Sequence, residues 1–304
     1  FQAEDGIRDI GVTGVQTCAL PISMSVAIIA KNEARHIQAA LASVQPHVRE
    51  VVVLVDASTH DDTAAIATVM GVTHIEITPW RGFPAQRNLA LTRCTQPWVF
   101  FVDADERVEA ALWDELSQLI PQVGADVAGM WMPRHNVFFG RILVGGGWYP
   151  DYQLRIVRRD VAHYDEQIEV HEVASVAGAT VQLQGHLTHL NIETFTELWQ
   201  KQAAYARREA ASMAQAGRTV RLRNYVGAPL REFNYRYIRH AGWRDGWVGL
   251  VLALVMAGIS TSSMPARRSS AVFALLTFAD PRIWSSLSTM PRPRKVTVCP
   301  AFNA

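Results

Sequence analysis

The sequence has few cysteines, almost no net charge and no apolar run long enough to cross a bilayer. It contains three cysteines in 304 residues, and Cys94 alone lies in the central part of the chain. A disulfide framework or thiolate zinc site is therefore excluded, and a reducing cytoplasm fits. The net charge of +1 argues against a dedicated nucleic-acid binder. The apolar run at 248–256 is shorter than the roughly 20 residues a spanning helix needs.

The two ends of the sequence differ from its centre. Residues 2–22 resemble the conceptual translation of a sequencing adapter and lack the basic and apolar segments of a secretory signal. We therefore expect residues 1–23 to be unstructured and the protein to start at Met24. From residue 258 to 304 the composition turns to Ser, Pro and Arg, which is typical of a frameshifted or disordered tail.

Strand and helix patterns alternate through the first half of the chain. We expect strands at 25–30, 50–56, 74–77, 98–102 and 128–132, and helices at 34–44, 62–70, 84–93 and 110–120. This order predicts an α/β fold, Rossmann-like, with a mostly parallel sheet and helices on both faces. The turn after the first strand lacks G-x-G-x-x-G, which argues against a dinucleotide-dependent dehydrogenase.

The most informative motif is Asp103-Ala-Asp-Glu106, which directly follows a strand that we expect to be buried on both faces. Ligands bind outside the carboxyl ends of such strands. Carboxylates suit a hard divalent cation that bridges to phosphates. The motif therefore predicts a nucleotide-sugar or nucleotide-phosphate site, although Asp-x-Asp also occurs in ordinary polar turns.

A second acidic loop follows the strand at 50–56. Asp56 ends that strand, and its carboxylate is suited to accept a hydrogen bond from N3–H of a uracil ring. The polar residues after it, Ser58, Thr59, Asp61 and Asp62, are typical of a helix N-cap. We assign Asp56 to base recognition and either Asp61 or Asp62 to the cap.

These motifs, taken in order, resemble the family 2 glycosyltransferases of GT-A fold. The resemblance rests on residues 25–33, 55–63, 83–90 and 102–105. Residues 149–159 and 170–172 are similar to the lipopolysaccharide-core beta-glucosyltransferase group. The resemblance runs to about residue 257 and implies a catalytic domain over 24–192. It also implies inverting, metal-dependent transfer of a hexose, with glucose from UDP-glucose favoured, to a lipopolysaccharide-core or lipid-linked acceptor.

The resemblance implies roles for residues of the donor site. Ala30, Glu33 and Asp56 would line the uridine pocket, and Arg87 would approach the phosphates or the second loop. Asp103 would lie near the ribose and the metal.

The resemblance also implies residues for the metal and for proton transfer. Asp105 would ligate Mg or Mn at the diphosphate, and His189 would lie on the metal or diphosphate. Inversion needs a base for the acceptor hydroxyl. Glu172 is the first candidate base and Asp151 the second. The spacing of His186 and His189 independently suggests that both point to one side of a strand and share a metal.

A helical region is expected at 193–257. Thr194-Phe-Thr-Glu197 is a capping box, and its helix should run to about residue 216 with Gly217 as its stop. Beyond it arginines and aromatics are interleaved: Arg218, Arg221, Arg223, Arg231, Arg236, Arg239, Arg244, Tyr225, Phe233, Tyr235, Tyr237, Trp243 and Trp247. This pattern is typical of a segment on an anionic membrane surface and predicts a peripheral protein on the cytoplasmic face of the inner membrane. The alternative is that the aromatics pack onto the catalytic domain.

Other functions stay open at this stage. The acceptor is alternatively a polyprenyl phosphate or a protein, and a membrane-bound protein that binds a nucleotide sugar without turnover is a hypothesis from another class. The sequence does not specify the oligomeric state.

Overall fold

The computed structural model describes residues 21–167, 173–215 and 224–262. The chain divides into two compact units. Unit 1 comprises Phe1–Trp199 and Phe233–Ala253, and unit 2 comprises Gln200–Glu232 and Leu254–Ala304. The large sheet and the sites described below belong to unit 1.

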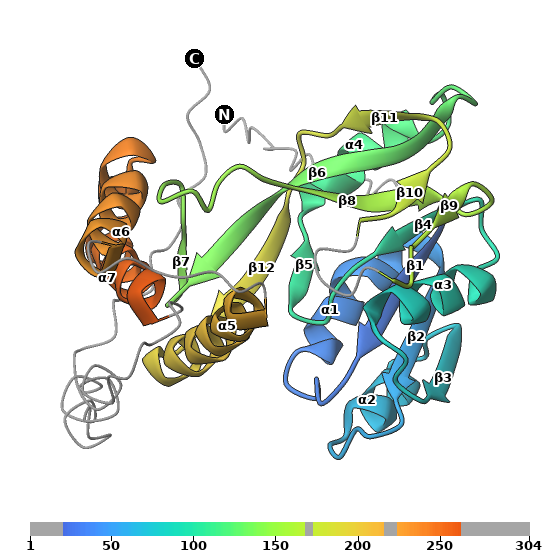
Figure 1. Ribbon diagram of the computed structural model, residues 1–304. Helices are drawn as coiled ribbons and strands as arrows, with labels where there is room; N and C mark the ends of the chain where they lie inside the picture. The colour runs from blue at the N-terminus through green and yellow to red at the C-terminus, as the bar shows by residue number, and fades with distance from the viewer. Residues whose placement is uncertain (1–20, 168–172, 216–223, 263–304) are drawn as a thin grey trace, which may run out of the picture. The chain divides into compact units, whose positions relative to one another are not determined.

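The first half of unit 1 has the predicted alternation of strands and helices (Figure 1). The parallel strands β1 (Ile22–Ala30), β2 (Val48–Asp56), β3 (His74–Thr78) and β4 (Trp98–Phe101) lie in the order β3-β2-β1-β4. Helices α1 (Ile37–Val44), α2 (Thr63–Val69), α3 (Phe83–Arg93) and α4 (Ala110–Leu119) connect or follow them. Strand β1 pairs with β2 on one side and with β4 on the other, so the order of the strands reverses at β1. Open α/β sheets form ligand crevices at such a point.

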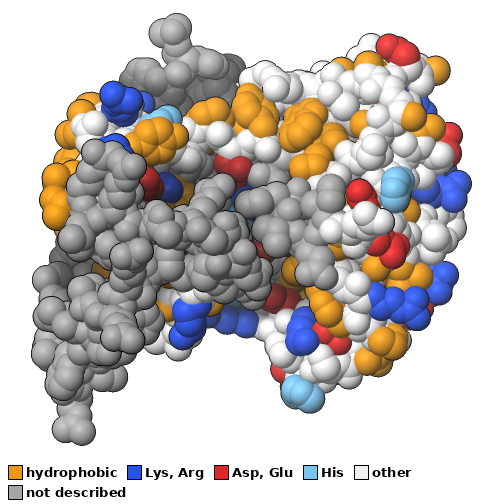
Figure 2. Space-filling model, in the orientation of Figure 1, with side chains coloured by type: hydrophobic (Ala, Val, Ile, Leu, Met, Phe, Trp, Pro, Cys, Tyr) orange, Lys and Arg blue, Asp and Glu red, His pale blue; other side chains and the backbone are white. Residues whose placement is uncertain are grey.

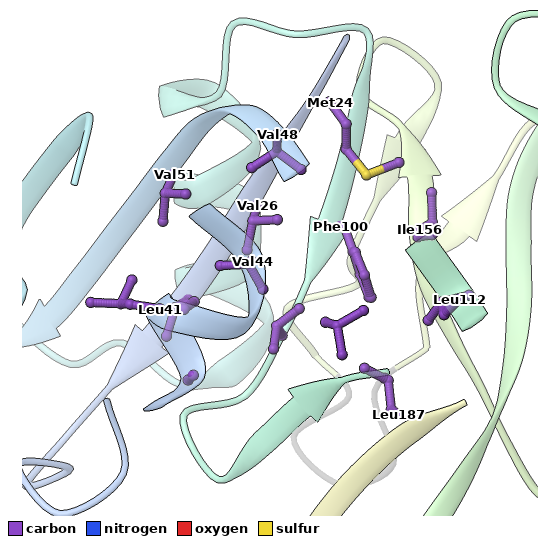
Figure 3. Packing of buried hydrophobic residues seen from close by; sticks show 14 of the residues in the cluster. Met24, Val26, Leu41, Val44, Val48, Val51, Phe100, Leu112, Ile156 and Leu187 are labelled. Atoms are coloured by element: carbon purple, nitrogen blue, oxygen red, sulfur yellow. The ribbon is translucent and has the colours of Figure 1, made fainter. Parts of the chain in front are cut away.

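Alternate residues of these strands build two cores, one on each face of the sheet. Val26, Phe100 and the odd-numbered valines of β2 pack with α1, α2 and α4, as Figure 3 shows for Leu41, Val44 and Leu112. Ala27, Val99, and Val52 and Leu54 of β2 pack instead with Ala90 and Leu91 of α3. The period of two in a strand places successive side chains on opposite faces, so the prediction of helices on both faces is confirmed.

The second half of the sheet is mixed rather than parallel. Strand β8 (Asp151–Arg158) lies between β4 and β6 (Val127–Phe138) and is antiparallel to both. Strand β12 (Leu187–Ile192) pairs in parallel with β6 and antiparallel with β5 (Glu106–Val108). The short strands are β7 (Arg141–Ile142), β9 (Ala162–His163), β10 (Ser175–Val176) and β11 (Ala179–Gln182).

Several expected boundaries move. Strand β1 begins at Ile22, which pairs with Val48, so Ile22 and Ser23 are extended rather than unstructured. Helix α5 (Phe195–Gln215) starts as its capping box predicts, because Thr194 Oγ1 accepts from Glu197 N at 3.2 Å. The Glu197 carboxylate accepts from Glu193 N at 2.9 Å, one residue earlier than in the usual capping box.

The C-terminal described segment is helical. It contains α6 (Asn224–Phe233), a π-helix at Asn234–Arg239, a 3-10 helix at Gly242–Asp245 and α7 (Gly246–Ser262). Residues Gly242–Ser260 have a mean hydropathy of 1.3 and are long and apolar enough to cross a membrane by length and composition. The expectation that this apolar stretch is too short is therefore wrong, because the helix extends beyond residues 248–256 on both sides. A buried core helix meets the same criterion, and 39% of this stretch is buried.

Candidate functional site

The loops after β1 and β4 open onto one cavity of about 560 Å³. Five of the residues predicted for the site line it together: Glu33, Arg87, Asp103, Asp105 and His189. They come from the loop after β1, from α3, from the loop after β4 and from β12. Segments far apart in the chain therefore meet at the edge of the sheet where the sequence places the acidic motif.

Asp103 is held by arginines. Arg155 Nη2 donates to Asp103 Oδ2 at 2.5 Å, and Arg87 Nη2 lies 3.8 Å from Asp103 Oδ1. Burial alone would raise the pKa of Asp103, but Arg155 and Arg87 hold that pKa well below its usual range. Asp103 is therefore a permanent carboxylate at physiological pH.

The same arginine reaches a second, fully buried carboxylate. Glu106 is 0% exposed and accepts hydrogen bonds from Arg155 Nη2 at 3.0 Å, Arg134 Nη1 at 3.1 Å and the backbone N–H of Asp103 at 3.0 Å. An ionised carboxylate buried this deeply needs such partners. Glu106 thus holds the Asp103 loop and both arginines in one ion network.

A bulge in β8 brings Arg155 to this position. Met130 pairs with Ile156 and the next residue, Trp131, pairs with Leu154, so Arg155 is the extra residue in the register. A bulge redirects the side chain of the inserted residue. Arg155 is 5% exposed and contacts Asp103 and Glu106 rather than following the simple alternation of its strand.

Asp105 faces an imidazole whose orientation is set by a chain of hydrogen bonds. Asn136 donates through Nδ2 to Asp151 Oδ2 at 3.0 Å and to the Trp148 carbonyl at 3.1 Å, which leaves its Oδ1 towards His189 Nδ1 at 2.8 Å. An amide oxygen only accepts, so His189 carries its proton on Nδ1. The other ring nitrogen, His189 Nε2, lies 3.3 Å from Asp105 Oδ2.

This pair fits a divalent cation. Adjacent ligands of an octahedral ion with metal–ligand bonds of about 2.1 Å lie roughly 3 Å apart, close to the distance between Asp105 Oδ2 and His189 Nε2. Metal-bound histidines characteristically donate their other N–H to an oxygen, as His189 does to Asn136. Among the described residues, arginines contact Asp103 and Glu106, whereas the ion-pair contact of Asp105 is with His189. Asp105 is therefore the carboxylate best placed to bind added positive charge.

Two of the residues expected in the uridine pocket are not part of the cavity lining. Ala30 is 2% exposed and packs in the core with α1 and α2, and Ile29 lines the cavity in its place. Asp56 is paired with Lys31, with Nζ and Oδ2 2.8 Å apart, and accepts from the backbone and hydroxyl of Ser58. The hydrogen bond from Lys31, supported by Ser58, lowers the pKa of Asp56 to about 2. The cavity lining described above does not include Asp56.

The two candidate bases have different outcomes. Asp151 accepts from Arg134 Nε at 2.9 Å, Asn136 Nδ2 at 3.0 Å and Gln153 Nε2 at 2.7 Å. Burial would raise the pKa of Asp151, but Arg134 and these donors lower it. A general base works best with a pKa near the working pH, so these contacts favour a positioning role for Asp151. Glu172 lies outside the described residues.

His186 and His189 do not share a side of the strand. They are three residues apart, and a strand has a period of two, so the expectation that both face one metal is wrong. His186 stacks on His135 with ring centroids 3.9 Å apart, and its Nε2 lies 3.1 Å from the Tyr149 hydroxyl. His189 alone faces Asp105.

Sequence reasoning missed Arg155, Glu106, Arg134 and Asn136 as members of the site. Glu106 belongs to the acidic motif Asp103-Ala-Asp-Glu106. A third carboxylate next to a buried strand needs a cationic partner, and this requirement was the signal in the sequence for a buried arginine. The other three lie on β6 and β8, whose antiparallel pairing and bulge have no signature in the local pattern.

Comparison with known proteins agrees with this geometry. Residues 25–170 match the family model described as glycosyl transferase family 2. The lipopolysaccharide core biosynthesis glycosyltransferase LpsC of Rhizobium meliloti (strain 1021) is 28% identical over 250 residues, covering 78% of this chain and 88% of the relative. An uncharacterized glycosyltransferase of Rickettsia felis is 39% identical over 103 residues, 34% of this chain and 36% of the relative. This chain therefore carries a glycosyl transferase family 2 domain at residues 25–170, and over most of its length it is similar to the glycosyltransferase LpsC.

Solved structures with related topology are more distant. A mannosyltransferase from Pyrobaculum calidifontis in complex with GDP-Man and Mn2+ has a TM-score of 0.45 and 17% identity, covering 87% of this chain and 83% of that one. Glucosyl-3-phosphoglycerate synthase from Mycobacterium tuberculosis in complex with Mn2+, UDP and phosphoglyceric acid has a TM-score of 0.39 and 16% identity. It covers 64% of this chain and 78% of that one.

Proposed function

We propose that this protein is an inverting, metal-dependent hexosyltransferase that moves glucose from UDP-glucose to a lipopolysaccharide-core or lipid-linked acceptor. The observation that carries the proposal is the cavity in which Asp105 and His189 face each other beside the arginine-bound Asp103. The family 2 domain and the similarity to LpsC support the reaction class and the acceptor class.

Asp105 and His189 would hold Mn or Mg in this proposal. The cation would neutralise the charge that develops on the departing diphosphate. A carboxylate with a neutral imidazole suits Mn at least as well as Mg, which prefers an all-oxygen shell. Arg87 lines the cavity at the Asp103 side, where its guanidinium is placed to contact a phosphate oxygen.

The remaining roles concern the nucleoside and the acceptor. We assign the ribose hydroxyls to Asp103, whose charge is balanced by Arg155, and the rim of the base pocket to Glu33 and Asp56. Glu172 remains our proposed base for the acceptor hydroxyl. Asp151 holds Asn136 and Arg134 and so positions His189 and Glu106.

The test is UDP release by the full-length protein from a panel of UDP-sugars with lipopolysaccharide-core and polyprenyl-phosphate acceptors, with and without Mn. We expect release from UDP-glucose, dependent on metal, and Asp105→Asn should lower kcat/KM on the order of 10³-fold because the diphosphate charge is then uncompensated. The matched control is Asp114→Asn, an exposed aspartate on α4, which should keep full activity.

Different results would overturn different parts of the proposal. Metal-independent turnover that survives Asp105→Asn contradicts the metal site. Glu172→Gln should abolish transfer while UDP still binds, and near-normal turnover in that variant would reject Glu172 as the base. UDP binding without turnover on any acceptor would favour a nucleotide-sugar-binding protein.

We also propose that unit 1 rests on the cytoplasmic face of the inner membrane through residues 235–247. Tyr235, Ile238, Trp243 and Trp247 are 45%, 57%, 58% and 52% exposed, and Arg239 and Arg244 are exposed beside them. Figure 2 shows, by contrast, charged side chains of both signs with hydrophobic ones between them over the part of unit 1 that Figure 1 draws with α2 and α3. Aromatic rings with arginines suit the interface of an anionic bilayer.

Part of this segment also packs inward, through Arg236 and Asp245. The Arg236 guanidinium lies 5.2 Å from the centroid of the Trp148 ring, and its Nη1 donates to the Gly146 carbonyl at 3.1 Å. Asp245 is buried and accepts from the backbone N–H groups of Val144 and Gly145. These contacts anchor the segment to the sheet domain and leave the outer aromatics exposed.

Vesicle sedimentation tests the membrane proposal. The full-length protein should bind vesicles with anionic lipid more tightly than neutral ones, and salt should weaken that binding. Replacing both Trp243 and Trp247 by Ala should weaken binding to the anionic vesicles roughly tenfold, since the apolar area that the two indoles bury in the bilayer interface is lost. Trp80→Ala, an exposed tryptophan outside the segment, is the control. Equal binding to both vesicle types, or an equal loss in the control, would refute the surface.

A further inference from the structure

A second cluster of side chains that can bind a metal lies on β6, directly before β12 and at the start of α4. One ligand atom from each of Glu109, His135 and His186 lies within 4.8 Å of the other two. Glu109 is the N-cap of α4, His135 is on β6, and His186 directly precedes β12. Segments separated by as many as 77 residues, from 109 to 186, therefore bring two imidazoles and one carboxylate together.

This cluster is separate from the donor site. His135 lies between Arg134 and Asn136, which contact the donor-site carboxylates, so the alternation of the strand directs His135 to the other face. Thr188, the register partner of His135, is likewise adjacent to His189 and points away from Asp105. The cavity at Asp105 has no residue of this cluster in its lining.

The contacts around the cluster prepare it to bind a cation. His135 Nδ1 lies 2.8 Å from Glu109 Oε1, and Thr188 Oγ1 donates to the same oxygen at 2.7 Å. Tyr149 contacts His186 Nε2 through its hydroxyl. Thr188 and Tyr149 therefore hold the carboxylate and one imidazole from outside, as second-shell groups do in metal sites.

The charge of the cluster points in the same direction. His186 and His135 stack with an interplanar angle of 10°, an arrangement that disfavours two imidazolium charges. Burial, with His135 as a second cause, lowers the pKa of His186. Among the described residues, Glu109 forms an ion pair with His135, and no arginine contact comparable to that of Asp103 is present there.

We propose that Glu109, His135 and His186 form a second metal site, which binds a borderline transition-metal dication with Zn2+ as its probe. Two imidazoles and one carboxylate form a common three-residue zinc ligand set with an open fourth position. With Zn–ligand bonds of about 2.0–2.1 Å, ligands of a tetrahedral ion lie roughly 3.4 Å apart. The ligand atoms lie at most 4.8 Å apart, so the largest approach required is about 1.4 Å, which is within the range of side-chain rotation. Glu109 and His135 are 33% and 22% exposed, so an ion has access.

The ion would join the N-terminus of α4 to β6 and the beginning of β12. Strands β6 and β12 carry Asn136 and His189, and Glu106 lies on β5 three residues before Glu109, so the site would brace the frame of the donor cavity. Binding of the ion would therefore raise the stability of the folded protein and would take no part in the reaction of the substrate. The inference stands on the cluster alone and does not depend on the proposed donor or acceptor.

The experiment is zinc titration of the full-length protein, followed by calorimetry, by metal analysis after dialysis and by the thermal midpoint. We expect one zinc equivalent that survives Asp105→Asn but is lost in His186→Gln and in Glu109→Gln. Saturating zinc, at about 100 times Kd, should raise Tm by roughly 5–10 °C in the unmutated protein and not in these variants. His163→Gln, an exposed histidine on β9, is the control.

Two further measurements exclude trivial explanations. Circular dichroism of each variant shows that it is folded, and Co2+ substitution in the unmutated protein reports tetrahedral coordination by its visible absorption without any mutation. Tetrahedral Co2+ that is displaced by Zn2+ supports the site. No stoichiometric zinc in the unmutated protein, or zinc that is lost only in Asp105→Asn, would overturn it. Failure of UDP release leaves this result unchanged, because the readout is metal content.

Discussion

Strands β6 and β12 carry two polar clusters, and the clusters differ in how their carboxylates are balanced. At the donor cavity, Asp103, Glu106 and Asp151 are each in contact with arginine, and His189 faces Asp105. At Glu109 the partners are the imidazole of His135 and the hydroxyl of Thr188. Guanidinium groups among carboxylates suit a phosphate and a hard cation together. Imidazoles with one carboxylate suit a borderline metal alone. Adjacent residues of one strand thus support two different kinds of site.

The largest expected effect on this comparison comes from Arg155→Met. The change leaves Asp103 and Glu106 without their shared cation, and removing one partner of a buried ion pair costs about 3–5 kcal/mol. Urea denaturation of the unmutated protein and the variant measures the loss. Arg93→Met is the control, because Arg93 pairs with Glu76 at the surface, and such pairs contribute at most about 1 kcal/mol. Equal costs for the two variants would show that the buried network does not hold the donor site together.

A crossed pair of variants sharpens the distinction between the two faces. Asn136→Ala removes the acceptor that orients His189, so Mn binding should weaken by roughly 10–100-fold while zinc binding stays unchanged. Thr188→Val removes the hydroxyl from Glu109 and should weaken zinc binding about tenfold while leaving Mn binding unchanged. Calorimetric titration of both metals into both variants measures the four values. If each variant weakened both metals equally, the two clusters would have to be treated as one site.

The smallest effect is expected at the edge of the donor site, where Lys31 holds Asp56. The pKa of Asp56 is lowered from 3.8 to about 2, chiefly by the Lys31 hydrogen bond. Because the folded pKa lies below the unfolded one, this contribution to stability is present above about pH 4 and lost as pH falls towards 2. In Lys31→Met the pKa should rise towards 3.8, as measured by carboxyl NMR titration. Lys201→Met is the control, and an unshifted Asp56 in Lys31→Met would reject the assignment.

Much of the first half of the fold follows from sequence. The nearly continuous apolar runs in 25–30, 50–56 and 98–102 correctly predict β1, β2 and β4, because strands covered by helices on both faces must be apolar throughout. Asp103 and Asp105 directly follow such a strand, so their place at the carboxyl edge is also predictable. Glu33 and Arg87, which the family resemblance assigns to the donor site, line the same cavity.

The second half was less predictable for physical reasons. Strands β6 and β8 pair antiparallel across a bulge, and one inserted residue changes which side chains face the site. The expectation that His186 and His189 face one side fails because they are three residues apart, and a strand with a period of two places such residues on opposite faces. The length of α7 was underestimated because Gly258 and the polar residues after it end the apolar pattern, whereas the helix continues to Ser262.

The sequence by itself determined the class of the protein, the parallel α/β half and the acidic motif at the end of β4. These depend on local periodicity and on short motifs, which neighbouring residues carry together. Only the tertiary structure decided that Arg155 balances Asp103 and Glu106, that Asn136 leaves His189 Nε2 facing Asp105, and that His186 joins His135 and Glu109 instead. Those contacts join residues up to 77 positions apart. The partner of each charge is selected by the register and twist of the strands, and no local sequence pattern encodes these.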